Sequence, residues 1–202
     1  MKGLTVIIPV KPPEPYLLDL KKTVNYFLKD IPHEIHVQTE TGLTNAIIAG
    51  VQKSKYSHIA VLDADGSHNP ATLITMIDKF NQDPTLDLII GAKNHPLSFD
   101  ASPYYRRLIS TIYRKLTCFI LNLKVQDPMS GYIMGTKKLF STIKPITDYK
   151  FLLQLLTHNP PPKVLEIPIY FAPRQRGKSK STFKTGLKAL HTIIKLWWKK
   201  VK

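Results

Sequence analysis

Residues 58–70 read HIAVLDADGSHNP, an apolar run that ends directly in two carboxylates. The run His58–Leu62 is short and is followed by turn-forming residues, which predicts a buried strand. Asp63 and Asp65 follow it, and two carboxylates at this spacing can share one divalent cation such as Mg²⁺ or Mn²⁺. A lone Asp-x-Asp is more commonly a solvated turn, so the strand context carries this interpretation.

The sequence on either side of this stretch alternates between strand and helix patterns. Further strands are expected at Leu4–Ile8, Ile35–Gln38 and Leu86–Ile90, and helices at Tyr16–Leu28, Leu43–Lys53 and from Pro70 to about Phe80. Such alternation predicts an α/β fold with a mostly parallel sheet and flanking helices. Ligands bind beyond the carboxyl ends of parallel strands, which is where Asp63 and Asp65 lie.

Two later segments have the pattern of basic amphipathic helices. Residues 103–123 repeat apolar side chains at helical spacing among arginines and lysines, and residues 181–202 carry one apolar and one basic stripe that end near Trp197 and Trp198. Basic amphipathic helices with terminal Trp residues are typical of helices that lie on an anionic membrane surface, although a helix packed on the domain has the same pattern. We therefore expect a main domain over 1–180 and a membrane-surface helix over 181–202.

Composition limits the classes of protein that remain. The 202 residues are 43% hydrophobic, which suits one domain, and carry a net charge of +15. That charge predicts a polyanionic partner: nucleic acid, an anionic membrane or a phosphorylated substrate. The single cysteine, Cys118, excludes an intrachain disulfide and a zinc site built from cysteines. Neither a signal peptide nor a membrane span is evident, so a cytoplasmic protein, peripherally associated with the membrane, is expected.

Several short motifs, taken in order, resemble one known family. The step from Asp63-Ala64-Asp65 to His68 and Pro70 resembles the polyprenyl-phosphate branch of the family 2 glycosyltransferases, to which the dolichol-phosphate mannose synthases belong. Four further features match that branch over roughly residues 42–185: Gly42-Leu43-x-x-Ala46, Ile90-Gly91-Ala92-Lys93, Asp127-Pro128-Met129-Ser130-Gly131-Tyr132, and Glu166-Ile167-Pro168-Ile169 followed by Arg174-x-x-Gly177-x-Ser179-Lys180. Together these are far more specific than any one motif.

The resemblance implies a GT-A fold and a reaction. A lipid phosphate would attack the anomeric carbon of a nucleotide-sugar with inversion, moving mannose from GDP-mannose or glucose from UDP-glucose to dolichyl or polyprenyl phosphate. Mannose is favoured because the two last motifs look most like the mannose synthases. A phosphate monoester is largely ionised at neutral pH, with a second pKa near ~6, so it needs positive charge and placement more than a general base.

The resemblance also implies roles for individual residues. Catalysis is assigned to Asp65 and Asp127, and the metal, Mg²⁺ or Mn²⁺, to Asp63 and Asp65. The expected contacts to the nucleotide-sugar are Pro9, Glu14, Asp63, Ala64, Asp65 and Lys93. The expected contacts to the acceptor phosphate are Arg106, Arg107, Ser130, Arg174, Ser179 and Lys180.

Three departures from the family pattern leave alternatives open. The usual Asp-Asp-x-Ser segment before Gly42 is missing. Ser67 stands where the family has Gln, and Ile133 stands where it has Arg. Third, no transmembrane helices are expected to follow, so contact with the membrane is expected through the amphipathic helices. A member that binds nucleotide or lipid without turnover therefore remains possible, as does a basic nucleic-acid-binding protein. Carboxylates at the site would repel a nucleic-acid backbone, so no nucleic acid is expected as a partner.

Overall fold

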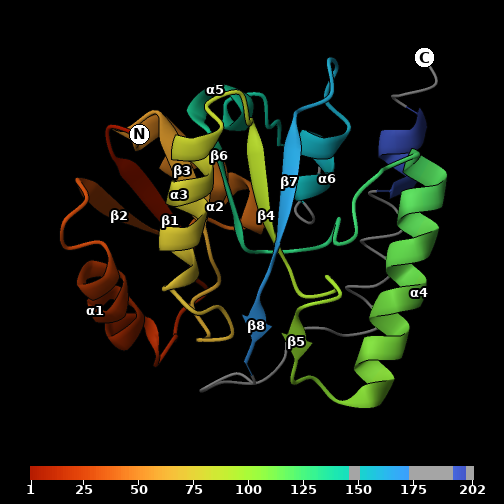
Figure 1. The fold of residues 1–202 in the computed structure, drawn as a ribbon, viewed down its shortest axis with the longest axis horizontal. Helices are drawn as coiled ribbons and strands as arrows, with labels where there is room; N and C mark the ends of the chain where they lie inside the picture. Colours follow the sequence, from red (N-terminus) through yellow and green to blue (C-terminus); the bar gives the residue numbers. More distant parts are fainter. Residues whose placement is uncertain (146–150, 173–192, 199–202) are drawn as a thin grey trace.

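A six-stranded sheet forms the centre of the computed structural model, which describes residues 1–145, 151–172 and 193–198 (Figure 1). The strand order is β2-β1-β3-β6-β4-β7, and β6 alone among these six runs antiparallel to its neighbours. The mostly parallel sheet expected from the sequence is therefore confirmed. The strands are β1 (Leu4–Pro9), β2 (His33–Gln38), β3 (His58–Val61), β4 (Leu88–Ala92), β6 (Ile133–Thr136) and β7 (Val164–Pro168).

Helices cover both faces of the sheet. The side chains of a strand alternate between the two faces, so Val6 and Ile8 of β1 pack with α1 and α3, whereas Ile7 packs with α2, α5 and α6. Each face thus has its own apolar core. The helices are α1 (Leu17–Phe27), α2 (Leu43–Lys53), α3 (Thr72–Gln82), α4 (Tyr104–Leu121), α5 (Lys137–Phe140) and α6 (Phe151–Leu156).

The helix α4 lies beside β7 at the edge of the molecule (Figure 1). Its last turn packs with α6 and with the short helix 193–198 through Leu121, Leu153, Ile193 and Leu196. Most of its other large apolar side chains are exposed, as are Trp197 and Trp198. Within the described ranges, none of the helices has both the length and the hydropathy to cross a bilayer.

A small two-stranded sheet extends beyond the carboxyl ends of β4 and β7. It pairs β5 (Phe99–Asp100) with β8 (Tyr170–Phe171), and Phe99 stacks on Tyr170 with ring centroids 5.4 Å apart. The carboxyl ends of β1 and β3 lie at the same edge, because both strands run in the same direction as β4. That edge collects the loops that carry the predicted site.

Candidate active site

The two carboxylates of the Asp-Ala-Asp motif lie just past the end of β3. Asp65 is buried, and one of its carboxylate oxygens accepts the backbone N–H of Ser67 at 3.0 Å. Gly66 makes this tight turn with a φ of +79°, a conformation that other residues rarely adopt. Asp63 is only partly buried. The turn therefore fixes one carboxylate inside the protein and leaves the other partly exposed.

His68 closes the same turn from inside. Its Nδ1 accepts the backbone N–H of Asp63 at 3.2 Å, and its ring stacks on Tyr132 with centroids 4.8 Å apart. Burial lowers the pKa of His68 below its ordinary value, against the opposing effect of Asp63 and Asp65. The neutral ring then carries its hydrogen on Nε2. His68 is thus a support of the turn and offers no lone pair for a metal.

The loop before β6 brings the second motif against the first. The Ser130 hydroxyl donates to the carbonyl of Gly91 at 2.7 Å and accepts the N–H of Tyr132 at 3.1 Å. A Cβ added to Gly131 would lie 2.9 Å from a carboxylate oxygen of Asp63, closer than side chains normally approach. The absence of a side chain at Gly131 therefore lets the loop touch the carboxylate of Asp63.

Asp127 is fixed in the same loop. Only 1% of its surface is exposed, and its Oδ2 accepts the backbone N–H of Lys93 at 3.1 Å. Its own backbone N–H donates to Glu166 of β7 at 2.7 Å. The loop residue predicted to act in catalysis thus lies between the ends of β4 and β7.

The side chain of Lys93 brings a cation to the same edge of the sheet. Its ammonium lies 3.7 Å from the Asp100 carboxylate and 4.8 Å from the centre of the Phe171 ring. Both contacts hold the side chain at the carboxyl edge of the sheet, on the side of the loop at residues 122–131. We refer to this loop, which carries the predicted acceptor motif, as the acceptor loop. Lys93 was expected to contact the donor, and this position suits a contact to any phosphate that lies between the two motifs.

Pro9 and Glu14 lie at the same edge, on the other side of β3. Pro9 is the last residue of β1, and Val10 after it donates its N–H to the carbonyl of Gln38 at 2.8 Å. Glu14 lies in the loop before α1, and its carbonyl accepts the N–H of Leu17. The structure therefore places both predicted donor contacts beyond the strand ends.

The predicted phosphate contacts are only partly described. Arg106 and Arg107 lie in the first turn of α4, with the Arg107 guanidinium 5.9 Å from the Tyr104 ring. The hydroxyl hydrogen of Ser130 is engaged with β4, so Ser130 fastens the loop in this structure, whereas the sequence was interpreted as making it a phosphate ligand. Three further predicted contacts lie outside the described residues: Arg174, Ser179 and Lys180.

The carboxylates at this site suit a hard divalent ion. In the described ranges no three His, Cys, Asp or Glu side chains lie close enough to hold a metal without other ligands. Mg²⁺ and Mn²⁺ are commonly bound by one or two carboxylates together with waters and substrate phosphates. Asp63 and Asp65 supply such carboxylates, so the residues fit an ion shared with a diphosphate.

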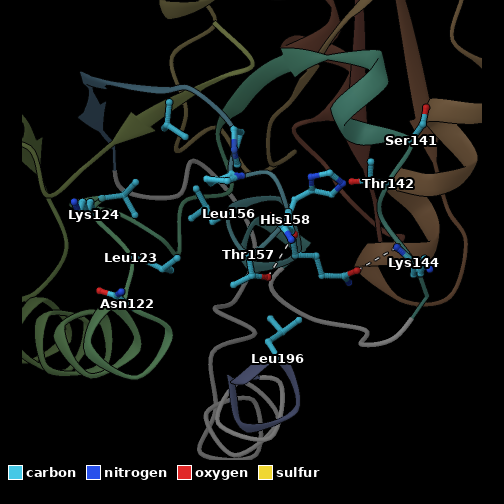
Figure 2. Close-up of a pocket in the computed structure, with 16 residues that line it drawn as sticks. Asn122, Leu123, Lys124, Ser141, Thr142, Lys144, Leu156, Thr157, His158 and Leu196 are labelled. Atoms are coloured by element: carbon cyan, nitrogen blue, oxygen red, sulfur yellow. Dashed lines mark hydrogen bonds between the residues drawn. The ribbon is translucent and has the colours of Figure 1, made fainter. Parts of the chain in front are cut away.

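A cleft of about 1290 Å³ lies elsewhere, near the start of β7 (Figure 2). Its lining includes Lys124 from the segment after α4, Lys144, and His158 from the segment after α6. None of the predicted site residues that the structure describes lines it. The cleft is therefore separate from the carboxyl-end site.

One residue at the site was missed as a functional candidate. Glu166 was recognised only as part of the Glu-Ile-Pro motif, yet its carboxylate accepts the N–H groups of Gln126 and Asp127. A charged residue in the middle of the apolar strand Val164–Pro168 is the signal that could have identified it, because such a residue needs partners.

Comparisons with known proteins identify relatives of this chain. The dolichol-phosphate mannosyltransferase of Pyrococcus furiosus is 30% identical over 164 aligned positions, and the match covers 78% of this chain and 45% of that protein. The dolichol-phosphate mannosyltransferase of Saccharomyces cerevisiae is 27% identical, covering 78% of this chain and 61% of the relative. The polyprenol monophosphomannose synthase of Mycolicibacterium smegmatis is 29% identical, with coverages of 75% and 60%. The chain thus spans only 45% to 61% of the length of these relatives.

A solved structure shows which fold the chain shares, and a family comparison shows which family it belongs to. Glucosyl-3-phosphoglycerate synthase from Mycobacterium tuberculosis, crystallised with Mn²⁺, UDP-glucose and phosphoglyceric acid, superposes with a TM-score of 0.72. The match covers 98% of this chain and 79% of that one at 11% identity, so it shows the shared GT-A fold. Residues 6–144 match the family described as Glycosyl transferase family 2. Since this match covers more than half of the sequence, the chain belongs to glycosyl transferase family 2.

Proposed function

We propose that this chain transfers a hexose from a nucleotide-sugar to a polyprenyl phosphate, with mannose from GDP-mannose as the favoured donor sugar. Three relatives are named as mannosyltransferases or mannose synthases that act with dolichol phosphate or polyprenol. The structural neighbour binds UDP-glucose, which keeps glucose as the second donor to test. The acceptor is a long-chain dolichyl or related lipid phosphate.

One observation carries the proposal: the two motifs expected to hold donor and acceptor meet at one point. Gly131 of the acceptor loop lies against the Asp63 carboxylate, at the distance given above for an added Cβ. The Tyr132 hydroxyl also reaches across, donating to the carbonyl of Asn69 at 3.0 Å. A diphosphate held by Asp63 and Asp65 would therefore place its sugar beside the loop that carries Asp127.

The side chains have distinct tasks in this proposal. A divalent ion, when bound by Asp63 and Asp65, would neutralise the donor diphosphate and stabilise the departing nucleotide. Because the acceptor phosphate is already anionic, Asp127 orients the acceptor or the sugar and does not need to remove a proton. Lys93 supplies positive charge beside it. The arginines of α4 and the basic motif at Arg174–Lys180 add further cations for the acceptor.

The exposed apolar face of α4 supports contact with a membrane, where a lipid acceptor is found. Phe119 is 86% exposed and Tyr104 73%, values that are unusual for such side chains in water. Arg107 and Lys115 lie on the same helix and can meet anionic headgroups. We propose that α4 and the Trp197–Trp198 pair lie on the membrane surface. Flotation with anionic liposomes tests this, and an α4 variant with Ile109→Ser and Phe119→Ser should float less.

The direct test of the proposed function is sugar transfer in liposomes that contain dolichyl phosphate. Radiolabelled GDP-mannose and UDP-glucose are supplied in turn, with Mn²⁺ or with EDTA. Label in the lipid phase from GDP-mannose, lost with EDTA and in Asp65→Ala, is the expected result. Asp78→Ala, an exposed carboxylate on α3, is the matched control and should keep full activity.

The same assay can contradict the proposal. Transfer from UDP-glucose alone would reassign the sugar and keep the acceptor. The absence of transfer from both donors, in a preparation that binds the liposomes, would show that the chain is a non-catalytic member of the family. Transfer that persists in EDTA and in Asp65→Ala would remove the metal from the proposal.

A further inference from the structure

Glu166 is an acidic residue in the centre of β7, where its neighbours in the strand are apolar. It pairs with Ile90 of β4 in the sheet. Its two carboxylate oxygens accept consecutive backbone N–H groups of the acceptor loop, from Gln126 at 2.6 Å and from Asp127 at 2.7 Å. Hydrogen bonds to an ionised acceptor are short and strong, so this carboxylate holds the loop backbone at two points.

The same stretch of loop is held from two other elements. Arg114 of α4 donates to the carbonyl of Gln126 at 3.0 Å, and Cys118 of α4 approaches the carbonyl of Val125 at 3.3 Å. From β4, the N–H of Lys93 donates to the Asp127 carboxylate. Of these contacts, those of Glu166 hold the two N–H groups that flank Gln126. Together with the bond from Arg114 to the Gln126 carbonyl, they fix where the peptide plane before Asp127 lies.

We propose that Glu166 is a positioning residue for Asp127, acting through the loop backbone and touching neither substrate. The inference rests on the proposed function, because it assigns Glu166 a part in that transfer. The Asp127 carboxylate faces β4 while its backbone is tied to β7, so release of the β7 contact lets Asp127 shift relative to the donor. The donor carboxylates Asp63 and Asp65 belong to the turn after β3, whereas the Glu166 carboxylate bonds to the loop before β6. The predicted defect is therefore in turnover and leaves donor binding intact.

A second strand glutamate provides a matched control. Glu34 of β2 accepts the backbone N–H of Lys55 at 2.6 Å and the hydroxyl of Thr5 at 2.6 Å. It fastens a loop as Glu166 does, but it lies at the amino end of the parallel strands, because it pairs with Thr5 near the start of β1. A change to Gln at either position removes the negative charge. At Glu166 it also places an amide NH2 against a backbone N–H, because the two bonds go to different oxygens, whereas at Glu34 both bonds go to one oxygen.

The experiment compares Glu166→Gln, the milder Glu166→Asp, and Glu34→Gln in the liposome transfer assay with the full chain and Mn²⁺. We expect Glu166→Gln to lower kcat by about 10-fold or more, because small displacements of a catalytic group are costly, while KM for GDP-mannose stays within about threefold. Glu34→Gln should leave both constants unchanged even where its Tm falls as far as that of Glu166→Gln. If Glu166→Gln does not fold, kcat and KM are measured for Glu166→Asp instead.

A double-mutant cycle with Asp127→Asn separates positioning from loss of structure. If Glu166 acts through Asp127, Glu166→Gln costs at most about twofold in the Asp127→Asn background, far less than in the wild-type protein. Equal fold-losses in both backgrounds, an unchanged kcat, or an equal loss in Glu34→Gln would each overturn the inference. A wild-type protein that transfers no sugar overturns the proposed function and this inference together, whereas an active wild type with a fully active Glu166→Gln overturns the inference alone.

Discussion

The two ends of the central sheet differ in whether their ionisable side chains are buried or exposed. At the carboxyl ends of the parallel strands, Asp65, His68 and Asp127 are buried, and among the described residues these are the buried Asp, Glu, His, Lys and Arg side chains. At the amino end, the ion pair of Asp83 with Lys163 leaves both side chains largely exposed, at 40% and 55%.

This difference indicates which end of the sheet carries the functional site. A buried ionisable group loses its hydration, and an ion pair or hydrogen bond only offsets part of that cost. The surface pair at the amino end carries little such cost and contributes little stability. Stability alone does not explain buried carboxylates at one edge of a small sheet, whereas the proposed site for a metal and two phosphates would. The comparison leads to four predictions.

The largest effect is expected where a buried carboxylate loses its charge. Asp65→Asn keeps an oxygen for the Ser67 N–H but weakens the hold on a divalent ion, which stabilises the transition state by several kcal/mol. We expect transfer activity to fall by at least about 100-fold, while the Tm measured in EDTA stays equal or rises. A clear fall in Tm would show that this end of the sheet needs the charge for its fold.

The second prediction compares two glycines beside and within β6. A Cβ at Gly131 meets the Asp63 carboxylate, whereas one at Gly135 meets the backbone carbonyl of Asp87 at 2.8 Å and the Phe140 ring at 3.1 Å. Gly131→Ala should therefore lower activity about 10-fold by displacing Asp63, with little change in Tm. Gly135→Ala should cost about 1–3 kcal/mol of stability through overpacking and leave kcat unchanged.

Thermal melts and transfer assays of both glycine variants check this contrast. The opposite outcome, with a stability loss at Gly131 and an activity loss at Gly135, would contradict the assignment of function to the carboxyl end of the sheet.

A smaller effect is expected at the exposed pair of the amino end. Bonds from Thr85 and Lys163 lower the pKa of Asp83 to about 2. The stabilisation is thus present above the ordinary pKa of 3.8 and is lost as the pH falls toward 2. Asp83→Ala should lower the Tm at pH 7 by no more than about 2 °C and leave transfer unchanged. A loss of activity here would mean that the amino end also takes part in function.

The smallest effect concerns a histidine at the amino end of β3. Burial, and secondarily the positive N-terminus, lower the pKa of His58 below its ordinary value of 6.5. The unfolded chain therefore takes up a proton first as the pH falls below 6.5, and stability declines from there toward the lower pKa of the folded state. His58→Gln should reduce the fall in Tm between pH 7 and pH 5 by about 1–2 °C, with unchanged activity at pH 7. Parallel curves for the two proteins would show that His58 does not contribute.

The sequence predicted the first half of the fold well, because its patterns there are local. The helix Leu43–Lys53 was placed with its observed bounds, and β1, β2 and β3 were each found within two residues. The strand β4 begins at Leu88, two residues later than expected, since the side chain and backbone of Asp87 bond to Lys163 ahead of β7. These cases rest on apolar periodicity and turn residues, which neighbours in sequence determine.

Elements that depend on partners far away in the sequence were not predicted. The strand β6 is four residues long and contains Gly135, so it has almost no local strand signal, and it forms because β3 and β4 bond to it on either side. The role of Glu166 likewise depends on a loop 40 positions away in the chain. Asp63, Asp65 and Asp127 were named through their motifs, but the approach of Gly131 to the Asp63 carboxylate is a property of the folded chain.

The reversed direction of β6 has a consequence for how the proposed site can diversify. The parallel strands bring the proposed donor residues to this edge from their final residues, whereas β6 brings the loop of Asp127 there from the residues that precede its start. The two groups of residues therefore belong to separate connections of the chain, which can change in length or sequence independently. On the proposed assignment, the loop at residues 122–131 can change while the Asp-Ala-Asp turn stays the same.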